Sequence, residues 1–312
     1  MTTSPTLQIQ LMGVRGSTPA PGDDFSTVGG HTSCLAVLPD SPDGRMLVLD
    51  AGTGFRNLAK VLGDSPLRAD VLLTHLHWDH MQGLPFLAQA DRPDASVELW
   101  IPLAGVRLDE PGPAAAPDHG EHGDPGASHK PVDDQALELL ARGFAPPSFP
   151  IRPDGLRGDW RFRALGPGPL PTARYQIHLD EVHHKGGTTL GIRVERDGRS
   201  FAYLPDHCIG VASPEQLARA GRLVQGVDVL FHGSQYLEAE RATADAFGHC
   251  TARDAVDLAH RAGAGRLVLI HHAPHRDDAH IGLVLGEAAA RVAELGSELS
   301  VEVGTEGLRL DL

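Results

Sequence analysis

The chain has few cysteines, few aromatic residues and no long apolar run. Its three cysteines, Cys34, Cys208 and Cys250, are scattered and form no CxxC pair. An odd, dispersed set of thiols argues against a disulfide framework and predicts a reducing, cytoplasmic location. No stretch of about 18 apolar residues occurs, so no membrane span is predicted. The first residues lack a basic segment followed by an apolar run, so no secretion signal is expected.

Positive charge is also scarce. The net charge is −14 and the isoelectric point is near 5.6. Proteins that bind nucleic acid without sequence preference usually present a basic surface, so this balance argues against a nucleic-acid partner. Aromatic residues make up 5% of the chain and hydrophobic residues 41%. We therefore expect a soluble protein with a core of aliphatic side chains and alanine, and its 312 residues fit one large α/β domain or two small ones.

Short apolar runs alternate with glycine-rich turns and predict a mixed α/β chain. The expected strands are 7–14, 33–38, 46–50, 71–74, 97–101, 160–165, 175–182, 191–195, 199–204, 227–232, 266–270, 299–303 and 308–312. The expected helices are 55–62, 81–88, 134–142, 214–223, 253–262 and 281–295, with Thr251 as a helix cap before 253–262. Residues 109–133 are rich in Pro, Gly and His and predict an insertion loop. Its histidines are either metal ligands or part of a solvated polar loop.

A run of four potential metal ligands follows the apolar stretch 69–74. It reads His75-Leu76-His77-Trp78-Asp79-His80. Imidazole and carboxylate groups suit zinc, iron and manganese. In an extended chain His75 and His77 project to the same side, and Asp79 and His80 follow where the predicted helix 81–88 begins. The run therefore predicts two adjacent metal sites rather than a histidine-rich surface turn.

Further candidate ligands follow other apolar strands. His183 and His184 come after 175–182, Asp206 after 201–204, and His271 after 267–270. Active sites in α/β proteins gather at such strand ends, so we expect these side chains to meet the histidine run. His249 lies in a glycine-containing turn before the predicted helix 253–262, as either a functional or a turn histidine.

The order HxHxDH, then His, Asp and His, resembles the metallo-β-lactamase superfamily. Within it, the chain is most similar to the branch that contains tRNase Z and the cyclic phosphodiesterases. The resemblance runs from about residue 7 to residue 280 and is carried by the segments 13–17, 49–54, 73–80, 203–206 and 248–249. This motif set is specific for the superfamily and is not specific for a substrate.

The resemblance implies a four-layer αββα sandwich of the α/β (α+β) class with a binuclear metal site. It also implies a single domain over residues 1–312. It places two divalent ions, zinc or else manganese or iron, at the edge between the sheets. One ion is held by His75, His77 and a histidine of the 183/184 pair, where His184 is preferred because it is nearer the following glycines. The other ion is held by Asp79, His80 and His271, and Asp206 bridges both.

The resemblance also implies roles beside the ligands. His249 contacts the scissile phosphate or protonates the leaving oxygen, and Asp79 and His249 are the expected catalytic residues. Asp50 orients a ligand imidazole, caps the following helix, or does both.

The expected function is hydrolysis of a small phosphodiester, such as a cyclic nucleotide, by metal-bound hydroxide. The alternatives are a tRNA 3′-processing endoribonuclease, a lactone or other ester hydrolase, and a non-catalytic metal-binding sensor module. The acidic insertion, with Lys130 as its one lysine, argues against tRNA. A homodimer is expected by analogy with the branch.

Overall fold

The strands form two sheets that face each other. The computed structural model describes residues 7–41, 44–109 and 130–312. The first sheet has seven strands in the order β14-β1-β2-β3-β4-β5-β6, and the second has seven in the order β13-β12-β11-β10-β9-β8-β7. The first sheet contains β1 (Gln8–Gly13), β2 (Cys34–Val37), β3 (Met46–Leu49), β4 (Arg68–Leu72), β5 (Ser96–Pro102), β6 (Asp159–Leu165) and β14 (Arg309–Asp311). The second contains β7 (Gly168–Pro171), β8 (Gln176–Glu181), β9 (Leu190–Arg196), β10 (Arg199–Leu204), β11 (Val229–Gly233), β12 (Arg266–Ile270) and β13 (Ser300–Val303).

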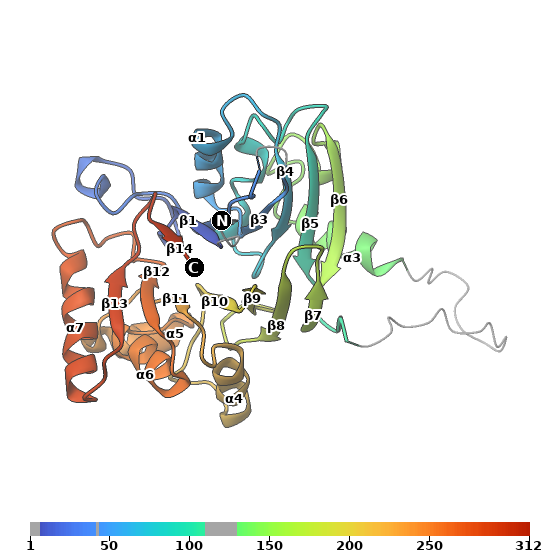
Figure 1. Ribbon diagram of the computed structural model, residues 1–312. Helices are drawn as coiled ribbons and strands as arrows, with labels where there is room; N and C mark the ends of the chain where they lie inside the picture. Colours follow the sequence, from blue (N-terminus) through green and yellow to red (C-terminus); the bar gives the residue numbers. More distant parts are fainter. Residues whose placement is uncertain (1–6, 42–43, 110–129) are drawn as a thin grey trace, which may run out of the picture.

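Helices cover the outer faces of both sheets (Figure 1). They are α1 (Ala59–Leu62), α2 (Trp78–Met81), α3 (Val132–Ala141), α4 (Pro214–Leu223), α5 (Arg241–Phe247), α6 (Ala252–Ala262) and α7 (Ile281–Glu294). Helix α3 packs on β5 and β6, α4 packs on β8 and β9, and α6 and α7 pack on the far strands of the second sheet. The layers therefore follow the predicted αββα order, and the predicted fold class is confirmed. Within the described residues, no helix is both long and apolar enough to cross a bilayer.

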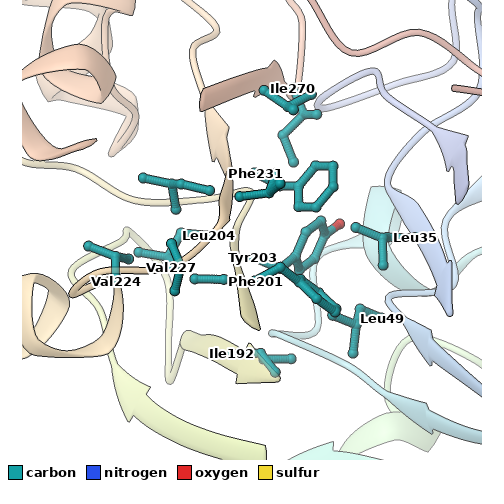
Figure 2. Packing of buried hydrophobic residues seen from close by; sticks show 14 of the residues in the cluster. Leu35, Leu49, Ile192, Phe201, Tyr203, Leu204, Val224, Val227, Phe231 and Ile270 are labelled. Carbon is teal, nitrogen blue, oxygen red and sulfur yellow. The ribbon is translucent and has the colours of Figure 1, made fainter. Parts of the chain in front are cut away.

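The core lies between the two sheets. Figure 2 shows Leu35 and Leu49 of the first sheet facing Phe201, Tyr203 and Phe231 of the second. All five side chains are at most 1% exposed. Burying a side chain of this size stabilises a fold by about 1.5–3 kcal/mol, so the contact fixes the two sheets relative to each other. The predicted single domain stays a prediction, which this shared core supports.

Both sheets deliver their strand ends to one region. Strands β3 and β4 are parallel neighbours, as are β10, β11 and β12. Parallel neighbours end at the same edge of a sheet. The residues that follow β3, β4, β10 and β12 include Asp50, the run from His75, Asp206 and His271. The sheet order thus gathers residues that are more than 200 positions apart in sequence.

Local structure differs from expectation after the histidine run. The predicted helix 81–88 is wrong, because α2 ends at Met81 and a short 3-10 turn, Leu84–Phe86, follows. Pro85 has no backbone N–H to donate, and Gly83 packs directly against the carbonyl of Gly52. Every predicted strand overlaps an observed one.

Two elements were not expected. The edge strand β7 contains two prolines, which a strand pattern tolerates only at an edge. Helix α5 has only seven residues and little apolar pattern. Most of the predicted insertion, residues 110–129, lies outside the described residues, and so does the prediction made for it.

Candidate metal centre

The histidine run spans a loop and the start of α2. Strand β4 ends at Leu72, residues 73–77 form the loop, and His77 precedes the first helical residue. His75 is buried and His77 is exposed, and their rings lie edge to face with centroids 4.4 Å apart. Asp79 and His80 are buried in the single turn of α2. The change from loop to helix therefore aims the two halves of the run at neighbouring points, as the sequence predicts.

Three histidines form the first group. The candidate ligand atoms of His75, His77 and His184 all lie within 4.8 Å of one another. Nδ1 of His184 lies 2.6 Å from the carbonyl oxygen of Gly248, so this nitrogen carries the proton and its Nε2 carries a lone pair. That Nε2 lies 3.3 Å from Nδ1 of His77. Two nitrogens that share a tetrahedral zinc ion at ~2.0–2.1 Å are themselves about 3.3 Å apart.

His184, rather than His183, belongs to this group. The ring of His183 points elsewhere, since its Nδ1 lies 3.3 Å from Nε2 of Gln216. Of the two neighbours, His184 is the one whose ring faces His77. The preference for His184 therefore has a geometric basis as well as the family resemblance.

Asp79, His80 and His271 form the second group. Nε2 of His271 lies 3.2 Å from Oδ2 of Asp79 and 3.4 Å from Nε2 of His80. Nδ1 of His80 donates to Oδ2 of Asp50 at 2.8 Å, so Nε2 is the nitrogen that faces the group. The carboxylate of Asp79 also accepts the backbone N–H of Ser17 at 2.6 Å. Asp79 and His80 are thus held in orientation by partners outside the group, whereas Nδ1 of His271 is buried without a hydrogen-bond partner.

Asp206 lies between the two groups. Its Oδ2 is 2.7 Å from Nε2 of His80 and 3.2 Å from Nε2 of His271. Toward the first group, Oδ2 is 3.8 Å from Nε2 of His75, and Oδ1 is 3.9 Å from Nε2 of His184. A carboxylate in this position can give oxygens to two cations at once.

The histidines of the first group are neutral at pH 7. Burial lowers the pKa of His75 well below its usual range and lowers the pKa of His184 to about 4. Neutral imidazole is the form that binds metal ions. Nε2 of His75 is also buried without a hydrogen-bond partner. An unpaired buried acceptor of this kind is costly unless a cation or a proton lies beside it.

The second group carries negative charge. Burial alone would lower the pKa of His80, but the carboxylates of Asp79, Asp50 and Asp206 raise it well above its usual range. Burial would likewise raise the pKa of Asp206, yet His271 and His80 hold it well below its usual range. Nε2 of His80 and Oδ2 of Asp206 lie 2.7 Å apart, so a proton or a metal cation must lie between them. The donor set therefore fits divalent metal ions.

His249 lies on the open side of Asp206. It sits in the turn between α5 and α6, and its Nδ1 is 3.0 Å from Oδ1 of Asp206. Its side chain is 12% exposed, and its ring lies 5.0 Å from that of His184 and 5.3 Å from that of His271. A histidine in this place can hand a proton to a molecule bound at the centre.

A cleft of about 390 Å³ opens beside His75 and His77. Leu76, Pro102, Leu103 and Leu139 give it an apolar wall, and the described lining residues include no lysine or arginine. Among the described lining residues of this cleft, only His75 and His77 are ionisable.

Backbone strain and close packing support the ligands. Asp50 and His271 have φ angles of 61° and 58°, a left-handed region that non-glycine residues rarely adopt. A Cβ on Gly16 would lie 2.3 Å from the ring of His271, and one on Gly186 would lie 2.9 Å from Nε2 of His77. The glycines at these positions let the chain approach the candidate ligand rings.

The structure tests the two helix caps expected at Asp50 and Thr251. The helix cap for Asp50 is wrong, since the helix after β3 begins at Thr53 with Gly52 as its cap. Asp50 instead accepts the backbone N–H of Thr74 at 2.7 Å and faces His80. Thr251 caps α6 as predicted, because its side chain accepts from the N–H of Asp254.

Other histidines and Arg276 do not line the centre. His272 is buried and donates through Nε2 to the carbonyl of Gly304 at 3.0 Å, whereas His275 is exposed. Arg276 is buried and forms an ion pair at 2.7 Å with the partly exposed Glu240.

Sequence reasoning missed the aromatic side chains beside the centre. Trp78, between His77 and Asp79, is 69% exposed, and Phe86 is 66% exposed. Trp78, Phe86 and Phe149 line a shared groove of about 240 Å³. The sequence signal for this groove was Trp78, a large apolar residue within a run of polar candidate ligands.

Comparison with known proteins agrees with this geometry. The family model of the beta-lactamase superfamily domain matches residues 45–272, which include every candidate ligand. Ribonuclease Z of Salinibacter ruber is 30% identical over 269 residues, covering 77% of this chain and 79% of that protein. Ribonuclease Z of Haloarcula marismortui is 27% identical and covers 85% of this chain and 86% of its own length.

Solved structures share the fold. The metallo-beta-lactamase fold protein YhfI from Bacillus subtilis has a TM-score of 0.67 at 17% identity, covering 99% of this chain and 100% of that one. The short form of human tRNase Z has a TM-score of 0.60 at 17% identity, covering 97% and 98%. A diphosphatase of the PhnP family has a TM-score of 0.61 at 16% identity, covering 98% and 97%. The chain belongs to the metallo-β-lactamase superfamily and is a hydrolase of that superfamily.

Proposed function

We propose that this protein is a binuclear metal-dependent phosphodiesterase that acts on a small phosphodiester, such as a cyclic nucleotide. The observation that carries the proposal is the position of Asp206, whose carboxylate faces both groups of candidate ligands. The phosphodiester chemistry rests on the family and on His249 beside that carboxylate.

Two divalent ions, with zinc as the proposed metal, would occupy the two groups. His75, His77 and His184 would hold one, Asp79, His80 and His271 would hold the other, and Asp206 would contribute to both. Neutral imidazoles and carboxylates suit zinc and also accept manganese or iron. When bound, such ions lower the pKa of a coordinated water towards ~7 and neutralise charge on phosphoryl oxygens.

His249 is the proposed proton donor to the leaving oxygen. Its Nδ1 is oriented by Oδ1 of Asp206, so its other ring nitrogen is the one left to meet substrate. A correctly placed general acid contributes roughly 10²–10⁴-fold to the rate of such a reaction. Asp79 is proposed to act through the metal that it holds.

The surroundings of the centre favour a small substrate. The cleft beside His75 is about 390 Å³ and has an apolar wall without lysine or arginine among its described lining residues. The whole chain carries a net charge of −14. A long polyanion gains most of its affinity from basic side chains that contact its phosphates, whereas a small diester needs only the two cations.

A tRNA 3′-processing endoribonuclease is the second candidate. The matches at 27% and 30% identity to proteins named ribonuclease Z favour it. The net charge and the uncharged cleft wall oppose it. Lactone or ester hydrolysis and a non-catalytic sensor role are the remaining alternatives.

The test is hydrolysis of bis(p-nitrophenyl) phosphate by the full chain before chelation, after it, and after zinc or manganese is restored. We expect turnover that chelation abolishes, and that His249→Ala reduces by about 10²-fold or more. His275→Ala, an exposed histidine outside the centre, is the matched control and should keep full activity.

A precursor tRNA with a 3′ trailer is assayed in parallel with the diester. Cleavage of the precursor that is faster than hydrolysis of the diester would replace the proposal with the ribonuclease. A fully metallated protein that turns over neither substrate would overturn phosphodiester chemistry.

A further inference from the structure

A second cluster of metal-binding side chains lies outside the candidate metal centre. His207, His232 and Cys250 are each at most 1% exposed. One candidate ligand atom from each lies within 4.8 Å of the other two. None of these residues has a part in the proposed hydrolysis.

Two residues of this cluster are sequence neighbours of residues at the candidate metal centre. His207 follows Asp206, and Cys250 follows His249, so two adjacent pairs each give one residue to either cluster. His232 lies near the end of β11, where its register partner on β10 is Leu204. Because side chains alternate along a strand, His232 lies on the opposite face from Phe231, which packs toward the first sheet (Figure 2).

The imidazole of His232 is oriented as metal ligands usually are. Nδ1 of His232 lies 2.8 Å from the carbonyl oxygen of Gly233, so Nδ1 carries the proton and Nε2 carries a lone pair. That Nε2 lies 3.1 Å from Nδ1 of His207. The separation is close to the about 3.3 Å expected of two nitrogens on one tetrahedral zinc ion.

A hydrogen bond between neutral His207 and His232 would explain why the two rings lie close together. It would not explain why the Cys250 thiol lies beside them. Cys250 converges on the same point as the two rings. Burial raises the pKa of the Cys250 thiol well above its usual range, although the backbone N–H of Ile209 acts in the opposite sense by favouring the thiolate. A buried cation would supply the positive charge that a thiolate needs here.

We propose that His207, His232 and Cys250 bind a third divalent metal ion, separate from the candidate metal centre. One thiolate and two imidazoles form a borderline-soft donor set that selects zinc over manganese or magnesium. On binding, Cys250 loses its thiol proton to solvent and its sulfur becomes a ligand. The ion would link His207 and Cys250 to His232 on β11. Because these two residues follow Asp206 and His249 in the chain, the ion would hold Asp206 and His249 in position.

Cobalt titration of the chelator-stripped full chain tests the site, because this is the one cluster of potential ligands in the described residues that contains a thiol. The ligands proposed for the candidate metal centre are nitrogen and oxygen atoms, so a thiolate-to-cobalt charge-transfer band reports on the new site alone. We expect this band in the wild-type protein, with three ions bound per chain at saturation. Cys250→Ser should remove the band and reduce the number to two.

Two further thiols give matched controls. Cys34→Ser and Cys208→Ser change buried cysteines outside the cluster, so both variants should keep the band and all three ions. His232→Gln should lower the affinity for the third ion at least tenfold. The wild-type spectrum decides the question even if a variant fails to fold. A wild-type protein with two bound ions and no thiolate band would overturn the proposal, as would a band that survives Cys250→Ser.

Discussion

At the scale of single residues, Asp50 is the link between the first sheet and the candidate metal centre. It follows β3, is fully buried, accepts from the backbone N–H and the hydroxyl of Thr74, and faces Nδ1 of His80. A carboxylate that holds a ligand histidine raises the basicity of that ligand and fixes its ring. Its left-handed φ of 61° shows that the fold tolerates strain to place it.

Asp50→Asn should weaken metal binding by roughly 10–100-fold, since the amide keeps the shape but loses the charge that orients His80. Competition with a chromophoric chelator measures the affinity. Asp70→Asn is the control, because Asp70 forms a partly exposed ion pair with Arg45 at 2.7 Å on the same sheet. Equal affinities in the two variants would contradict the role of Asp50.

His272 makes the free energy of unfolding depend on pH. Burial lowers the pKa of His272 to about 3 from a usual value of 6.5, against the opposing effect of its bond to Gly304. Between these values the unfolded chain binds more protons than the folded chain, so stability rises with pH across this window and falls as pH drops. Going from pH 6.5 to pH 5 should cost about 2 kcal/mol through this residue.

Urea denaturation of the chelated protein at both pH values measures this loss. His272→Gln keeps a donor for Gly304 and cannot titrate, so its stability should fall by about 2 kcal/mol less over the same range. Identical pH slopes for the variant and the wild type would show that folding does not shift the pKa of His272.

At the scale of elements, the turn after α2 depends on close backbone contact. Gly83 donates its N–H to the carbonyl of Ala51 at 2.8 Å, and a Cβ on Gly83 would lie 2.0 Å from the carbonyl oxygen of Gly52. This contact and Pro85 end the helix that the sequence pattern predicts. Helix α2 therefore has a single turn, and this turn places Asp79 and His80 at the candidate metal centre.

Gly83→Ala should lower the free energy of unfolding by about 1–3 kcal/mol, because the neighbouring backbone must move to admit the methyl group. Gly286→Ala is the matched control on α7, where nothing lies within 4 Å of the added Cβ. That variant should gain roughly 0.5–1 kcal/mol from helix propensity. Urea denaturation measures both, and a Gly83→Ala protein as stable as the wild type would refute the steric account.

At the scale of the whole molecule, the contact between the sheets decides whether the candidate metal centre forms. The histidine run follows β4 in the first sheet, whereas Asp206 and His271 follow β10 and β12 in the second. Phe231, Tyr203 and Leu35 pack between these sheets (Figure 2). The ligand groups therefore meet only when this core is intact.

Phe231→Ala should lower the free energy of unfolding by about 3–5 kcal/mol, since it leaves a cavity in the packed centre. Phe247→Ala removes the same side chain from a position that is 56% exposed, and should change stability by no more than about 0.5 kcal/mol. Thermal unfolding of the two variants compares them directly. Similar melting temperatures would mean that the sheets are held together elsewhere.

The sequence by itself determined the local features of this protein. Apolar runs set the strands, the Thr251 cap set the start of α6, and the HxHxDH run with later His and Asp residues indicated a metal centre at strand ends. These signals are carried by residue type and by spacing over a few positions, which is why they can be read without a structure. The superfamily followed from the same residues.

The tertiary structure decided which side chains meet. Sequence spacing could not separate His183 from His184, because that choice depends on how the chain leaves β8. It could not join His207, His232 and Cys250, because their meeting depends on the parallel pairing of β10 with β11 and on the packing of the turn before α6. Such contacts are set by sheet order and by the shape of a shared core, and neither leaves a local pattern in the chain.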